Sequence, residues 1–162
     1  MDPLLRKARA CTLCQEFLPF DPKPILSFSK EAKILIVGQA PGTKAHKSGT
    51  PWNDASGERL RDWLGVTKEQ FYDNSIFAIV PMGFCYPGKG KSGDLPPRPE
   101  CSAQWMQLIL KQLKKIELTI LIGSYSQNYF LKTGSGDLTT TVRNWAKYSP
   151  HYFPLPHPSP RN

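Results

Sequence analysis

The sequence lacks the long apolar segments of membrane and secreted proteins. No apolar run approaches the roughly 20 residues that a membrane span requires. The first residues, Met1-Asp-Pro-Leu-Leu-Arg-Lys7, have no apolar core like that of a signal peptide. Internal repeats and low-complexity tracts are also missing. We therefore expect a cytoplasmic, monomeric protein that folds as a single domain over residues 1–162 and makes no membrane contact.

Acidic residues are scarce relative to basic ones. Lys and Arg together number 21, and Asp and Glu number 13, which gives a formal net charge of +8 at pH 7. This excess suits a polyanionic partner, because each phosphate that a protein neutralises releases condensed counterions from nucleic acid. The alternative is that the charge merely keeps the protein soluble.

Four short apolar segments are typical of strands, and helical patterns separate them. The expected strands are Lys33–Val37, Ser75–Val80, Glu117–Gly123 and Tyr152–Leu155. The expected helices are Met1–Ala10, one around Leu60 that stops at Gly65, Lys68–Tyr72, Glu100–Lys115, Tyr125–Leu131 and Leu138–Tyr148. Strands that alternate with helices pair in parallel through right-handed crossovers. We therefore predict an α/β fold, a three-layer α/β/α sandwich with a central four-stranded, mainly parallel sheet.

Other segments carry weaker signals. Thr43–Thr50 is polar and basic, and Pro81–Pro99 is expected to be a long loop rich in glycine and proline. In the Glu100–Lys115 helix, the apolar stripe is expected to consist of Trp105, Leu108, Ile109 and Leu113. We interpret this stripe as ordinary core packing.

The first strand ends in a candidate ligand loop, Gly38-Gln-Ala-Pro-Gly42. In open α/β sheets, ligands bind at the carboxyl ends of the strands. Glycine there permits a positive φ or lets a ligand approach the backbone closely. An ordinary turn after the strand is the alternative.

Two superficial motif matches fail. A phosphate-binding loop starting at Gly38 would need glycine at Thr43 and Ser or Thr at Ala45. Gly123-Ser-Tyr-Ser-Gln127 has the form of a nucleophile elbow, but Tyr125 occupies the position of the nucleophile. We interpret both segments as structural.

The four cysteines favour a metal centre. Cys11 and Cys14 form a C-x-x-C pair, and Cys85 and Cys101 lie sixteen positions apart. In a chain without a signal peptide, four cysteines favour a metal over disulfides. Thiolates suit an iron–sulfur cluster or zinc, and unligated thiols are the third alternative. A cluster would join the amino-terminal helix to the long loop in a structural role.

Several motifs in order give the chain a resemblance to a known family. Gly38–Gly42 follows the first strand, Gly49-Thr-Pro-Trp52 comes next, and His157-Pro-Ser-Pro160 follows the last strand. With these motifs the chain resembles the uracil-DNA glycosylase superfamily. The cysteine pattern, including its sixteen-residue step, is most similar to the iron–sulfur families four and five. The resemblance implies a [4Fe-4S] cluster at Cys11, Cys14, Cys85 and Cys101, with zinc as the alternative.

The resemblance also implies a function. It predicts a hydrolase of base excision repair that flips a uracil or another deaminated base from DNA and hydrolyses its N-glycosidic bond. The partner would be DNA that contains a damaged base. The alternative is a non-catalytic module of the same fold that binds damaged DNA.

Each matched position then acquires an expected role. His157 would donate a hydrogen bond to the departing base, and Trp52 would stack on it. Gln39 would take part in catalysis, and the segment Gly38, Ala40, Pro41 and Gly42 would line the pocket. Ser159 would bind a DNA phosphate. The alternatives are a loop histidine between prolines for His157 and a core residue for Trp52.

The chain departs from its relatives at three positions. Family four has Glu where this chain has Gln39, and other relatives place a water-activating Asp near Ala40. We expect Asp54 to supply the missing carboxylate, because Asn53-Asp-Ala-Ser-Gly57 resembles a segment of family five; a helix cap is its alternative role. Pro81 falls where family four reads uracil with Asn, so relaxed base choice or loss of activity is expected. Arg161 is expected to contact phosphate.

Overall fold

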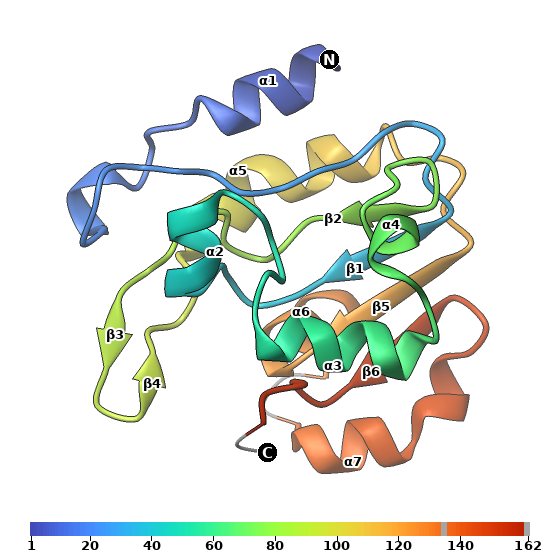
Figure 1. Ribbon diagram of the computed structural model, residues 1–162. Helices are drawn as coiled ribbons and strands as arrows, with labels where there is room; N and C mark the ends of the chain where they lie inside the picture. The colour runs from blue at the N-terminus through green and yellow to red at the C-terminus, as the bar shows by residue number, and fades with distance from the viewer. Residues whose placement is uncertain (134–135, 161–162) are drawn as a thin grey trace.

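The computed structural model describes residues 1–133 and 136–160 and contains a four-stranded central sheet (Figure 1). Its strands are β1 (Ile34–Val37), β2 (Phe77–Ile79), β5 (Leu118–Ile122) and β6 (Tyr152–Leu155). They lie in the order β2-β1-β5-β6, and every neighbouring pair is parallel. The predicted four-stranded sheet is confirmed.

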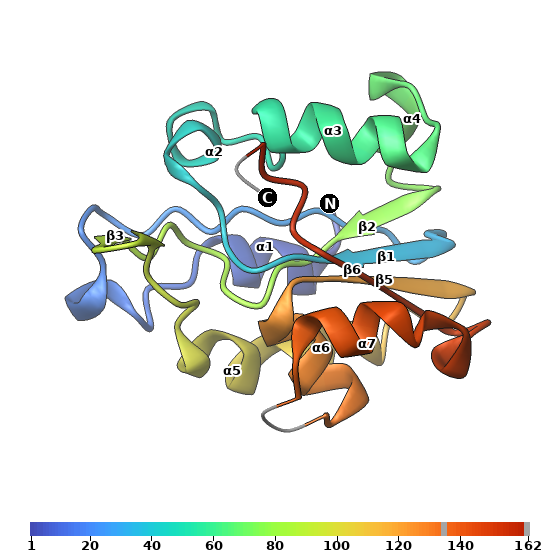
Figure 2. The same ribbon diagram turned by 90° about the horizontal axis from the view of Figure 1, so that it is seen from below.

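Helices cover both faces of this sheet, as Figure 2 shows. α1 (Pro3–Arg9), α5 (Pro99–Leu110) and α6 (Ser124–Leu131) pack on one face, and α3 (Ala55–Leu64) and α4 (Lys68–Phe71) pack on the other. Strand side chains alternate between faces, so Leu35 and Val37 enter the first core and Ile36 enters the second. Because both faces are covered, the strands are apolar apart from Thr119 of β5. The protein is the predicted three-layer α/β/α sandwich.

Short capping signals fix several helix ends. Asp2 caps α1 by accepting hydrogen bonds from the backbone N–H groups of Leu4 and Leu5. α4 begins with a capping box between Thr67 and Gln70. None of the described helices is long and apolar enough to cross a membrane.

Two small elements form where the sequence shows no periodicity. α2 (Thr43–Ser48) occupies the polar, basic stretch and buries only Ala45. β3 (Lys89–Gly90) and β4 (Gly93–Asp94) pair as an antiparallel hairpin inside the segment expected to be a loop. Figure 1 shows this hairpin extending away from the central sheet, close to α2. Both elements are too short or too polar to produce an apolar pattern.

Two expected helices are shorter than the sequence suggested. α5 ends at Leu110, although Leu113 beyond it is still buried. Leu108 is 41% exposed and does not belong to the buried stripe, where Met106 lies instead. The helix expected over Leu138–Tyr148 divides into α7 (Leu138–Arg143) and a 3-10 turn at Trp145–Tyr148.

Candidate active site

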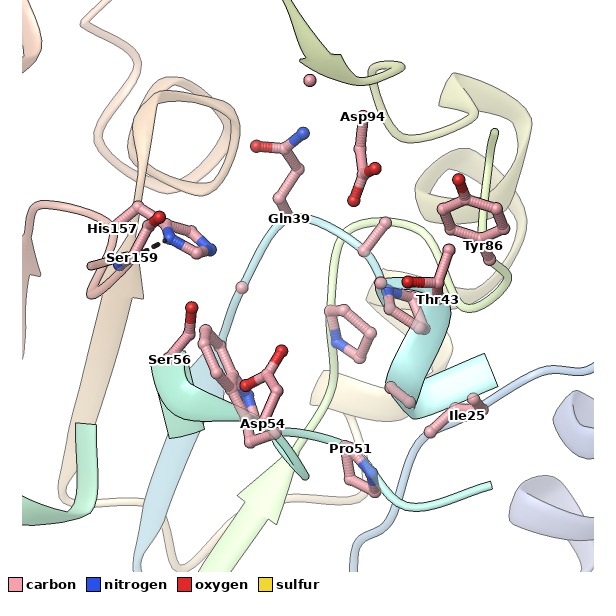
Figure 3. Close-up of a pocket in the computed structure, with 18 of the residues that line it drawn as sticks. Ile25, Gln39, Thr43, Pro51, Asp54, Ser56, Tyr86, Asp94, His157 and Ser159 are labelled. Atoms are coloured by element: carbon pink, nitrogen blue, oxygen red, sulfur yellow. Dashed lines mark hydrogen bonds between the residues drawn. The ribbon is translucent and has the colours of Figure 1, made fainter. Parts of the chain in front are cut away.

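A pocket of about 590 Å³ opens where the carboxyl ends of the strands meet. The loops after β1, β2 and β6 border it, together with the segment before α3 and the β3–β4 hairpin. Figure 3 shows side chains from these segments around one space. All ten residues that the resemblance assigns to catalysis or substrate binding line it: Gly38, Gln39, Ala40, Pro41, Gly42, Trp52, Asp54, Pro81, His157 and Ser159. The structure brings them together, and the role of each stays a prediction.

Trp52 forms one wall of this pocket. Its indole packs so closely on Gly38 that a Cβ there would lie 2.8 Å from Cζ2 of the ring. Its ring centroid lies 5.8 Å from that of His157, at an interplanar angle of 34°. Trp52 also packs against the core under α3. It is therefore a partly buried pocket residue that also packs on the core.

The backbone of Trp52 has φ 57°, in the left-handed region that bulky residues seldom adopt. Nη1 of the buried Arg61 donates a hydrogen bond to the carbonyl oxygen of Trp52 at 3.1 Å. The hydroxyl of Tyr72 donates to the carbonyl oxygen of Pro51 at 2.7 Å. A Cβ at Gly57 would lie 1.7 Å from the same Trp52 oxygen, so this position requires glycine. Sequence reasoning missed Arg61 and Tyr72, because polar residues in a helical pattern give no signal of such contacts.

The side chain of His157 is fixed by its own loop. The backbone N–H of Ser159 donates to Nδ1 of His157 at 3.1 Å, shown as the dashed line in Figure 3. Burial lowers the pKa of His157, although the charges of Asp54 and Asp94 oppose this shift. In the neutral ring, an acceptor at Nδ1 places the proton on Nε2. His157 can therefore act as a neutral donor.

Two carboxylates border the pocket. Asp54 caps α3, with Oδ1 accepting from the backbone N–H of Gly57 at 2.9 Å. Asp94 comes from β4, and its Oδ2 would lie 3.7 Å from a Cβ placed on Gly42. Sequence reasoning missed Asp94, because the hairpin that carries it is hidden in a segment rich in glycine and proline. Both charges raise the pKa of His157, which places both within electrostatic reach of its ring.

Gln39 supplies the carboxamide of the pocket within the described residues. Its backbone oxygen accepts from Gly83 at 3.0 Å, and that of Gly38 accepts from Met82 at 2.9 Å. These bonds join the loop after β1 to the loop after β2. Pro81 is buried in the second loop and has no side-chain amide to offer a base.

A comparison with models of known protein families matches residues 27–162 to the uracil DNA glycosylase superfamily. The match covers most of the chain, including every strand of the central sheet. The chain belongs to the uracil-DNA glycosylase superfamily. This membership supports a DNA glycosylase-like function and the binding of DNA as substrate.

In this member of the uracil-DNA glycosylase superfamily, all four cysteines border one small cavity beside α5. Cys11 and Cys14 lie upstream of the matched residues, and Cys85 and Cys101 lie within them. The backbone N–H of Phe84 donates to Sγ of Cys101 at 3.4 Å. The indole N–H of Trp105 donates to Sγ of Cys11 at 3.3 Å. Four thiols are the type of ligand that zinc and iron–sulfur groups take.

The thiols are not arranged as a closed metal site. Within residues 1–133 and 136–160, no three side chains of His, Cys, Asp or Glu are grouped so that they could hold a metal ion. Burial raises the pKa of Cys101 to about 12 and that of Cys85 to about 11. Arg161, expected to contact phosphate, lies outside the described residues.

Proposed function

We propose that the protein is a monofunctional DNA glycosylase that excises uracil or another deaminated base in base excision repair. The observation that carries this proposal is the imidazole of His157, oriented by the Ser159 N–H and placed beside Trp52 in the pocket. A glycosylase must extrude its target nucleotide, because the bond to be cleaved is inaccessible inside the duplex. A pocket at the ends of parallel strands can receive such a base.

In the proposed mechanism, His157 stabilises the departing base. Cleavage leaves negative charge on the base oxygen and positive charge on the sugar. Nε2–H of His157 would donate to that oxygen, and one such preorganised donor contributes about 2.7–4 kcal/mol. A neutral donor suits this step because it needs no proton from solvent when the pocket closes on a base.

Water activation is assigned to a carboxylate outside the first loop, because that loop has Gln39 and Ala40. Asp54 is the first candidate. Its capping bond uses Oδ1, so the cap and a water-positioning role are compatible. Asp94, from the β3–β4 hairpin, is a second candidate, since it also borders the pocket. Either charge would offset the positive charge on the sugar.

The test is base excision from labelled DNA containing uracil, hypoxanthine or xanthine, followed by cleavage of abasic sites with alkali. We expect scission with at least one of these bases. We expect His157→Ala to lower the single-turnover rate about 100- to 1,000-fold. The single-turnover rates of Asp54→Asn and Asp94→Asn show which carboxylate the reaction needs. Asp62→Asn on α3, outside the pocket, is the matched control. A protein that cleaves none of the three substrates contradicts the proposal.

The second candidate function is a non-catalytic module that binds damaged DNA. Ala40 and Pro81 favour it, because both replace side chains that relatives use for chemistry or base reading. It predicts binding to damaged DNA that weakens steeply with salt and yields no abasic product. Binding that is independent of salt would exclude it.

We also propose that Cys11, Cys14, Cys85 and Cys101 hold an iron–sulfur cluster, with zinc as the alternative. Their shared cavity and their chemistry support this proposal. When bound, the group would supply a structural link between the segment after α1 and α5. The base-binding pocket itself needs none of these thiols.

A further inference from the structure

A cluster of three aromatic rings extends outward from the wall of the pocket. Phe20 stacks on His46 with ring centroids 5.2 Å apart and on Tyr86 with centroids 6.2 Å apart. Tyr86 is 5% exposed and lines the pocket, whereas Phe20 is 56% exposed. Figure 3 shows the ring of Tyr86 at the side of the pocket opposite His157. The rings therefore form a continuous aromatic path from the pocket to the surface.

Three lysines lie on the same segments as Phe20 and His46. Lys44 and Lys47 belong to α2, which also carries His46. Nζ of Lys23 donates to the backbone oxygen of Lys47 at 3.4 Å. All three lysines are exposed. We call Phe20, His46 and Tyr86 with Lys23, Lys44 and Lys47 the Phe20 platform.

Two aspartates and a further lysine lie on the segments that carry the platform and the pocket. Asp21 follows Phe20 directly, and Asp94 lies on the hairpin side of the pocket. Lys89 lies on the same hairpin and also borders the pocket. Positive charge thus predominates along the path from the pocket to Phe20.

Phe20 contributes little to the core, since more than half of its side chain contacts solvent. In the described part of the chain, the enclosed Nδ1 atom of His46 has no hydrogen-bond partner. Its imidazole stacks on Phe20 and makes a tilted ring contact with Tyr86 at a centroid distance of 6.1 Å. The result is a preformed aromatic surface among cations, the combination that binds unpaired nucleotides.

We propose that the Phe20 platform binds the DNA strand next to the extruded nucleotide, with one unpaired base stacked on Phe20 and the lysines on its phosphates. The preferred substrate is then DNA that is single-stranded around the target base. Stacking requires an unpaired base, and a duplex offers none at that position. The placement of the strand relative to the pocket rests on the proposed function, but binding to the platform can be measured without excision.

The test measures the Kd of a labelled, lesion-free single-stranded oligonucleotide by fluorescence anisotropy. We expect Phe20→Ala and Phe20→Leu to weaken binding roughly 5- to 150-fold, and Phe20→Trp to retain it. Leu keeps the apolar volume without an aromatic face, so it separates stacking from packing. Trp145→Ala is the matched control, because Trp145 is 46% exposed and packs against Phe153 of β6. Equal Kd values for wild type, Phe20→Ala and Phe20→Leu would overturn the proposal.

Two further arms complete the experiment. A fully paired duplex should bind with a Kd that Phe20→Ala leaves unchanged; an equal loss on duplex would overturn the single-strand preference. Replacing Lys23, Lys44 and Lys47 with Gln should reduce the slope of log K against log salt by about 0.7 for each phosphate that the protein no longer neutralises. The control replaces Lys111 and Lys114, beyond the end of α5, with Gln. If no base is excised but Phe20→Ala still weakens binding, the catalytic proposal fails and this one stands.

Discussion

His157 has two features that bear on its chemistry, a bond that fixes its tautomer and burial that favours its neutral form. Both favour the neutral imidazole with its proton on Nε2. The Ser159 N–H occupies Nδ1, and burial lowers the pKa of the ring. The neighbouring carboxylates limit this shift, because they favour the imidazolium. Proline on each side of His157 and beyond Ser159 restricts the backbone that presents the ring.

We predict that His157 titrates below its ordinary pKa of about 6.5 in the folded protein. Two-dimensional NMR of the imidazole signals would measure the midpoint, with His157→Asn assigning the resonance. A midpoint at or above the ordinary value would contradict the neutral-donor mechanism.

The same shift links folding to pH. The unfolded chain takes up the His157 proton as pH falls through its ordinary pKa, whereas the folded chain resists it. The stability that the buried neutral His157 contributes is therefore fully present above that pKa and is lost as the pH falls below it. We expect the Tm of wild type to fall more than that of His157→Asn between about pH 7.5 and pH 5. Parallel Tm curves for the two proteins would contradict this expectation.

At the scale of elements, the turn before α3 sets the position of Trp52. Its left-handed backbone costs about 1–2 kcal/mol for a residue with a Cβ. The hydrogen bonds from Arg61 and Tyr72 offset that cost, and Arg61 also lies 5.3 Å from the ring centroid of Phe71. Residues on the buried side of α3 and just after α4 therefore determine where the pocket wall stands.

We predict that Arg61→Gln lowers the free energy of unfolding by about 1.5–3 kcal/mol, because it removes the buried charged donor of the Trp52 carbonyl. Tyr72→Phe should cost about 0.5–1.5 kcal/mol through the loss of one neutral hydrogen bond. Urea unfolding would measure both changes. Arg143→Gln at the exposed end of α7 is the control and should stay within about 0.5 kcal/mol of wild type. If Arg61→Gln behaves like the control, the turn does not depend on Arg61.

The sequence was most informative where physical constraints are strongest. Strands buried on both faces must be apolar, so Ile34–Val37 and Leu118–Ile122 are recognisable without the structure. Parallel strands end at one edge, which explains why residues as distant as Gln39 and His157 could be expected in one pocket.

The missed elements lack those constraints. α2 buries one residue, and each strand of the β3–β4 hairpin is only two residues long. Neither element therefore produces a hydrophobic periodicity in the sequence. Asp94 was therefore not expected at the pocket. The capping role, which was the alternative for Asp54, is confirmed, and its catalytic role stays a prediction. The environment of Trp52 depends on contacts between segments that no local pattern encodes.

At the scale of the whole molecule, the amino-terminal segment stands apart from the family match yet touches the body at several points. The guanidinium of Arg9 donates to the backbone oxygen of Leu26 at 2.9 Å, and Leu5 and Ala8 enter the main core. The indole N–H of Trp105, on α5, donates a hydrogen bond to Sγ of Cys11. The segment also supplies Phe20 to the surface beside the pocket. Its attachment therefore affects both stability and the proposed strand-binding surface.

A metal group at the four cysteines would strengthen this attachment, because it would join Cys11 and Cys14 to Cys85 and Cys101. We predict that protein purified without air shows the visible absorption of an iron–sulfur cluster and that Cys14→Ser removes it. Cys14→Ser should also lower Tm by more than about 5 °C, since each kcal/mol corresponds to about 2–4 °C in a chain of this size. Ser102→Ala, beside Cys101, is the control and should change neither property. A colourless protein with one bound zinc ion would select the alternative metal. Four titratable thiols without iron or zinc would contradict the metal centre, and the amino-terminal segment would then be held by α1 packing and the Arg9 and Cys11 contacts alone.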